Sequence, residues 1–83
     1  MKIDIKDLLV LDDNNEYVVV SKTIYNNKTY YYLMDINNNE NIKFLLENGD
    51  LEEIEDKILI TKLLPRFLKE IQKELDNTGN NNE

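Results

Sequence analysis

The chain has 83 residues, a formal net charge of −7 and no cysteine. Its length suits one small domain, and a hydrophobic content of 41% argues against wholesale disorder. Missing cysteines indicate a reducing compartment, and no apolar run approaches the ~20 residues that span a membrane. We therefore predict a cytoplasmic domain over residues 1–76, followed by a disordered polar tail over residues 77–83.

Alternating apolar residues predict three strands in the first half of the chain. The segment before the first strand, residues 1–7, either extends that strand or frays. Asn26-Asn27 predicts a two-residue hairpin turn, because asparagine tolerates positive φ better than most residues. The expected strands cover residues 8–11, 17–25 and 29–36. In the second strand we expect Tyr17, Val19, Ser21 and Thr23 on one face and Val18, Val20 and Ile24 on the other.

Two more strands are expected in the middle of the chain. Residues 37–40 are predicted to form a loop that leads into a strand over residues 41–47. Asn48-Gly49 then predicts a type I′ turn, which needs positive φ at both central positions. A fifth strand is expected over residues 51–54.

From Asp56 onward the apolar residues recur every three or four positions, which predicts an amphipathic helix. Pro65 leaves two starts open: near Asp56, as a cap, with a kink at Pro65, or near Thr61. The predicted fold is α+β, an antiparallel β-meander of about five strands with one C-terminal α-helix packed on one sheet face. Its other face would stay half exposed. The expected apolar helix face comprises Ile60, Leu63, Leu64, Phe67, Leu68, Ile71 and Leu75.

The residue types needed for common catalysis are largely missing. The chain has no histidine, cysteine or tryptophan and only two glycines, which argues against an enzyme and against a cofactor. Asp12, Asn14 and Glu16 imitate the start of a calcium loop. Tyr17 and Thr23, however, stand where that loop needs glycine and glutamate. We therefore predict no catalytic, cofactor or metal site.

Charged and aromatic residues give the candidate interaction surface. An acidic run near the predicted fifth strand is typical of a solvated edge strand or of a docking site for a basic partner. The predicted helix also carries a basic stripe, formed by Lys62, Arg66, Lys69 and Lys73. Because the net charge of the chain is −7, which repels phosphate groups, no direct nucleic-acid binding is expected. Tyrosines in the predicted strands either pack on the surface of the sheet or anchor a partner protein at an interface. The candidate residues are Glu47, Asp50, Glu52, Glu53, Glu55, Asp56 and Tyr31.

Three segments carry a family resemblance. Residues 11–17 combine an apolar strand end, an acidic turn and a glutamate, residues 30–33 read Tyr-x-x-Leu, and residues 49–56 form an acidic strand before the helix. In these features the chain resembles the YrzB-type family of small acidic bacterial proteins. Asn14-Asn15 replaces a glycine expected in the first turn, and Pro65 lies outside the family pattern. The resemblance implies an accessory protein with no assigned activity.

Three hypotheses about function follow. The first is a non-enzymatic module that docks a protein partner through the acidic edge or a tyrosine-bearing sheet face. The second is an inhibitor of phage or mobile-element type that mimics nucleic acid by its negative charge. The third is a self-associating structural protein, whose helix or sheet face is completed by a second copy.

Overall fold

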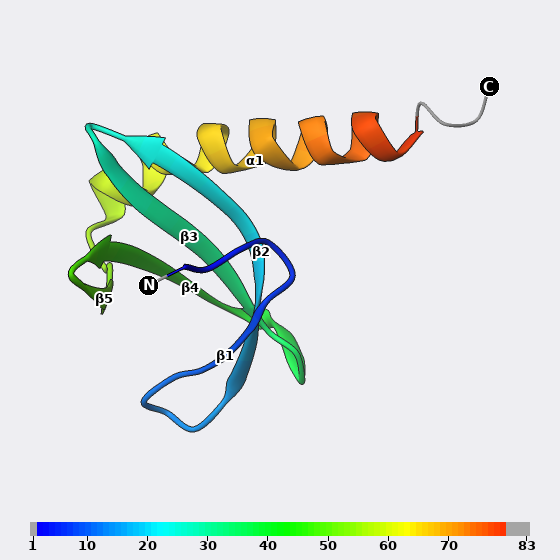
Figure 1. Ribbon diagram of the computed structural model, residues 1–83. Coiled ribbons are helices and arrows are strands. Elements are labelled where there is room, and N and C mark those ends of the chain that lie inside the picture. The colour runs from blue at the N-terminus through cyan, green and yellow to red at the C-terminus, as the bar shows by residue number, and fades with distance from the viewer. Residues whose placement is uncertain (1, 80–83) are drawn as a thin grey trace.

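A five-stranded antiparallel sheet and one long helix make up the fold (Figure 1), which confirms the predicted α+β meander. The structure, a computed structural model, describes residues 2–79. Strands that follow one another in sequence are neighbours in the sheet, and the helix comes last. The elements are β1 (Leu8–Val10), β2 (Glu16–Tyr25), β3 (Lys28–Asp35), β4 (Asn38–Asn48), β5 (Asp50–Glu53) and α1 (Lys57–Gly79).

The two predicted hairpin turns have different outcomes. Asn26 and Asn27 have φ values of 52° and 66°, and Tyr25 pairs with Lys28, so the two-residue turn is confirmed. At the later turn, only Gly49 has positive φ, at 79°. The predicted type I′ turn over Asn48-Gly49 is therefore wrong, because Asn48 is already the last residue of β4.

The predicted loop over residues 37–40 is shorter in the structure. Asp35 pairs with Asn38, and its Oδ1 accepts a hydrogen bond of 2.8 Å from the N–H of Asn37. This Asx-type contact turns the chain within two residues. Strand β4 therefore begins at Asn38 rather than at the expected Asn41.

A β-bulge in β2 exchanges the two faces of that strand. Val19 pairs with Leu33, but Ser21 pairs with Tyr32, so Val20 is the additional residue. Residues 19 and 21 consequently lie on opposite faces of the sheet. The prediction of one shared face was wrong: Tyr17 and Val19 lie on one side, and Ser21 and Thr23 lie on the other.

The first core lies on the concave side of the curled sheet. Tyr17, Val19 and Leu33 are fully buried there, and Leu45 joins them from β4. The expectation that this face stays half exposed was wrong, because curling lets the sheet cover its own side chains.

The N-terminal segment closes this core instead of extending β1 or fraying. Lys6 has a φ of 78° and its N–H donates to the carbonyl of Val19 at 2.8 Å. The chain reverses there and places Ile3 in the core at 4% exposure. The ammonium of Lys22 donates to the Ile3 carbonyl at 3.0 Å, which holds the segment on the sheet.

Helix α1 forms the second core on the opposite face of the sheet. Leu63 and Phe67 are fully buried against Tyr30, with Tyr32 and Phe44 packed around them. Aromatic side chains from two strands therefore meet one helix face.

The start of α1 agrees with the first of the two predicted starts. Asp56 Oδ1 accepts hydrogen bonds from the N–H groups of Ile58 at 3.0 Å and Leu59 at 3.3 Å, which is an N-cap. Pro65 lies inside the helix. The helix continues to Gly79, so residues 77–79 of the expected tail are helical, and residues 80–83 lie outside the described residues.

The predicted apolar face of the helix is only partly buried. Leu63 and Phe67 face the sheet, but Leu64, Leu68 and Leu75 are 36%, 58% and 59% exposed. At 100° per residue the predicted apolar residues form one continuous face, with the buried pair at one side and the exposed residues at the other. The single broad face expected from sequence is thus present, but only one side of it packs on the sheet.

Candidate functional site

A groove separates the two edge strands of the sheet. Strands β1 and β5 each pair with one neighbour only among the described residues. The groove between them has a volume of about 470 Å³. It is lined by Val10, Leu11, Asp12, Asp13, Lys43, Leu45, Leu51 and Glu53.

The floor of the groove is apolar and continuous with the first core. Leu45 is 3% exposed, and the partly buried side chains of Leu11 and Leu51 pack against its cluster from opposite edges. Burying such partly exposed leucines contributes about 25 cal/mol per Å² of apolar surface. An apolar side chain of a ligand would therefore gain by lying here.

Along this groove, strand β5 has backbone groups that pair with no other strand among residues 2–79. The N–H of Ile54 donates to the carbonyl of Phe44 at 2.8 Å, and hydrogen-bonded positions alternate along an antiparallel strand. The N–H and C=O groups of Leu51 and Glu53 consequently point away from β4. An edge of this kind can accept another strand.

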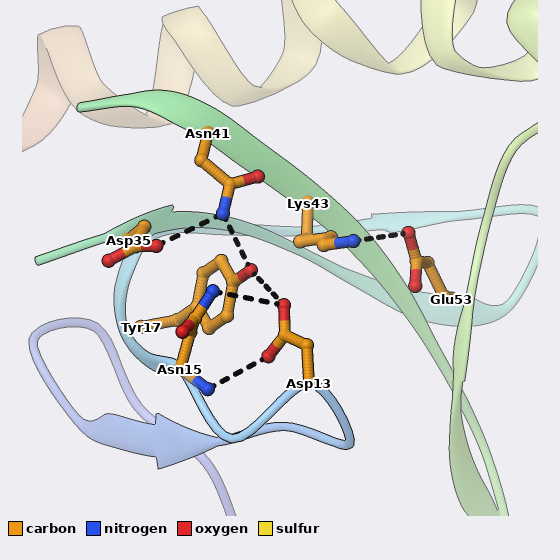
Figure 2. Close-up of polar contacts among 7 residues, drawn as sticks. All are labelled: Asp13, Asn15, Tyr17, Asp35, Asn41, Lys43 and Glu53. Atoms are coloured by element: carbon orange, nitrogen blue, oxygen red, sulfur yellow. Dashed lines mark hydrogen bonds and ion pairs between the residues drawn. The ribbon is translucent and has the colours of Figure 1, made fainter. Parts of the chain in front are cut away.

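A polar network supports the other rim, at the turn between β1 and β2 (Figure 2). The hydroxyl of Tyr17 donates to Asp13 Oδ2 at 2.7 Å, and the backbone N–H of Asn15 donates to Asp13 Oδ1 at 2.9 Å. Asn41 links this cluster to β3, because its amide donates to the Tyr17 hydroxyl at 2.9 Å and to Asp35 at 3.0 Å. The network fixes the position of the Asp13 carboxylate.

Two pKa values in this network are shifted in opposite directions. The Tyr17 hydroxyl, followed by the Asn15 N–H, lowers the pKa of Asp13 because both stabilise its charged form. Burial, and then the nearby Asp13 carboxylate, raise the pKa of Tyr17. Asp13 is thus an anion and Tyr17 a neutral donor at neutral pH.

This arrangement predicts a pH-dependent effect of Asp13→Asn on stability. Because the folded-state pKa of Asp13 lies below its unfolded value of ~3.9, its contribution is present above about pH 4 and is lost as pH falls through the folded pKa. Asp13→Asn should therefore cause a small loss of stability at neutral pH that shrinks in acid. The urea midpoints of the wild type and the variant, compared at neutral pH and in acid below about pH 4, measure this difference. An equal loss of stability at both pH values would contradict the prediction.

Lys43 and Glu53 form an ion pair between the neighbouring strands β4 and β5, on one wall of the groove, with Nζ and Oε2 separated by 3.1 Å (Figure 2). The hydrogen bond and charge of Glu53 raise the pKa of Lys43. Both side chains stay partly exposed, at 25% and 42%, so the pair contributes little to stability. In the described part of the chain, no ion pair involves Asp12 or Asp13, the other anionic side chains of the groove.

The six acidic candidates do not form one patch. Strand alternation places Glu47 and Glu53 on the concave face, and Asp50 and Glu52 on the helix-bearing face. Asp56 caps α1, and Glu55 is exposed between β5 and the helix. Four of the six therefore lie in or beside β5, on both of its faces.

Tyr31 is a core residue, so its assignment to an interaction surface was wrong. Its side chain is 1% exposed, and its hydroxyl donates to the Glu47 carboxylate. Burial, followed by this contact, raises the pKa of Tyr31. The reason is topological: the sheet curls over the face that carries Tyr31.

Several groove residues were missing from the candidates drawn from sequence. Leu11, Lys43 and Leu51 are distant in sequence and meet only because the sheet curls. Their local patterns are those of ordinary strands, so no short-range signal marks them. Among the groove residues, Asp12 and Asp13 of the polar turn and Glu53 of the acidic run stood out in the sequence.

Within the described part of the chain, no group of three or more acidic side chains is placed to hold a metal ion. No helix among those residues is long and apolar enough to cross a membrane. Comparison with family models, curated proteins and solved structures finds no match to this chain, so the YrzB-type resemblance stays a prediction.

Proposed function

We propose that this chain is a non-enzymatic protein-interaction module that binds an extended, basic segment of a partner protein along β5. One observation carries the proposal: the free edge of β5 combines an apolar groove on one face with acidic side chains on both. The net charge of −7 would attract such a segment over a distance of about one Debye length.

Backbone pairing supplies the affinity in this proposal. The outward N–H and C=O groups of Leu51 and Glu53 would bond to the added segment, as in other cases of β-strand addition. The four-residue length of β5 limits the number of such bonds. Side-chain contacts must therefore contribute to the binding.

Side-chain alternation defines the chemistry of the partner. Residues of an added strand that neighbour Leu51 would face the groove and its leucines, so they should be apolar. Residues that neighbour Asp50 and Glu52 would face the other side, so they should be lysine or arginine. The expected partner segment alternates apolar and basic residues.

Nucleic-acid mimicry is less well supported by the same positions. A mimic presents its carboxylates in a row, where an enzyme binds phosphates, but β5 divides its acids between two faces. The ion pair with Lys43 also offsets the charge of the Glu53 carboxylate, which a mimic would need to present to the enzyme. These observations favour strand addition over mimicry.

A labelled peptide that alternates valine and lysine tests the proposal. Reversing one charge with Glu52→Lys should weaken its binding about tenfold, which is ~1.4 kcal/mol. Glu40→Lys is the matched control, since it also reverses one charge and Glu40 is exposed at the other end of β4. Fluorescence anisotropy at low and high salt measures the affinity.

The expected result is binding to the wild type and to Glu40→Lys that weakens with salt. No binding of this peptide to the wild type at low salt would contradict the proposal. Equal losses in the β5 variant and the Glu40 control would also contradict it, because they would reflect net charge rather than the edge of β5.

A further inference from the structure

An uncovered row of apolar side chains crosses the helix-bearing face of the sheet. Leu8 pairs with Val18, Val18 with Met34, and Met34 with Ile42, so the four residues lie side by side across β1 to β4. Leu8 is 56% and Ile42 37% exposed, and Val18 and Met34 are half-buried. We call these four residues the sheet row.

Helix α1 carries a second uncovered apolar surface. Its C-terminal half extends beyond β2, past the body of the sheet (Figure 1). Leu64, Leu68, Ile71 and Leu75 follow one another at steps of four, three and four residues, which aligns them on one side of the helix. Three of them are between 36% and 59% exposed. We call these four residues the helix stripe.

The sheet row and the helix stripe match in length. Four neighbouring strands at a spacing of ~4.8 Å make the row about 14 Å long. The stripe covers eleven residue steps of ~1.5 Å and is about 16 Å long. A helix lying across the strands could therefore cover the whole row.

The area available lies at the lower limit for a dimer. The row and the stripe leave roughly 500 Å² of apolar-residue surface uncovered per copy, or about 1,000 Å² for two copies, which is the smallest total area expected of a specific interface. The neighbouring exposed residue Ile36, at 45%, would supply more. A twofold arrangement covers both surfaces of both copies at once.

We propose that two copies of this chain form a twofold dimer in which the helix stripe of each packs across the sheet row of the other. The interface is separate from the β5 edge, so each proposal stands or falls alone. The occupant is a second copy because each molecule carries both complementary surfaces.

Engineered cysteines test the pairing, since the chain has none of its own. Leu68→Cys and Met34→Cys proteins, mixed under oxidising conditions, should form a mixed disulfide between copies. Leu68→Cys crosslinked only to itself would show helix-on-helix contact and overturn the proposal. Absence of any crosslink, with a monomer by sedimentation at high protein concentration, would also overturn it.

Sedimentation of charge variants provides the matched control. Leu68→Glu should convert the dimer to a monomer, because it places a carboxylate in the centre of the stripe. Ile58→Glu should leave the dimer intact, since Ile58 is 71% exposed but lies on another side of α1. Equal behaviour of the two variants would contradict the assigned interface.

Discussion

Phe67→Ala should destabilise the domain by about 3–5 kcal/mol, as large-to-small changes of buried aromatic residues usually do. Phe67 is fully buried, and its ring centroid lies 5.7 Å from that of Tyr32 and 5.9 Å from that of Phe44. Its carbonyl also accepts a hydrogen bond of 3.1 Å from Ser21 Oγ. The change would remove the side chain that joins the helix to two strands.

Urea denaturation, followed by circular dichroism, measures this loss. Small domains have total stabilities of about 5–15 kcal/mol, so the variant should unfold at much lower urea concentration. Ile58→Ala is the control, because Ile58 is exposed on the same helix and its replacement should change stability by less than about 1 kcal/mol. A Phe67→Ala protein as stable as the wild type would mean that α1 does not pack on the sheet as described.

Pro65→Ala should have the second largest effect, a gain of about 1–3 kcal/mol. Pro65 lies inside α1 and has no N–H to donate to the carbonyl of Thr61, one turn earlier. Alanine restores that hydrogen bond and has the best helix propensity. Because Pro65 is exposed, little packing is lost when its ring is removed.

Pro65→Gly separates the two sources of this gain. Glycine restores the N–H but has a helix propensity about 1 kcal/mol worse than that of alanine. Its stability should therefore fall between those of the wild type and Pro65→Ala. Destabilisation by Pro65→Ala would show instead that the proline ring directs Leu63 and Phe67 towards the sheet.

Sequence predicted those features that short-range chemistry determines. The Asn26-Asn27 turn follows from the tolerance of asparagine for positive φ, and the Asp56 cap follows from a carboxylate placed before an apolar helix. The five strands were predicted to within about three residues at each end. Each of these features depends on residues close together in the chain.

Features that depend on distant residues were not predictable in this way. The bulge at Val20 accompanies pairing of Val19 with the N-terminal segment, and no local pattern signals that contact. Strict alternation therefore assigned Ser21 to the wrong face. Burial of Tyr31 and formation of the groove have the same origin, because both need the sheet to curl.

The candidate site also combines a feature that the sequence predicts with one that it does not. The acidic character of β5 is visible in the sequence, and the structure places that strand at a free edge. The apolar floor of the groove is not visible, since Leu11, Leu45 and Leu51 come from three separate strands or turns. The partner chemistry we propose rests on combining these two observations.

Hydrogen exchange at individual amides tests the central proposal most directly. We expect the valine-lysine peptide to slow exchange of the Leu51 and Glu53 amides, because their N–H groups would become bonded to the added strand. The Ile54 amide, already bonded to Phe44, serves as the internal reference and should change less. Peptide binding that leaves the Leu51 and Glu53 amides unprotected would contradict strand addition at β5.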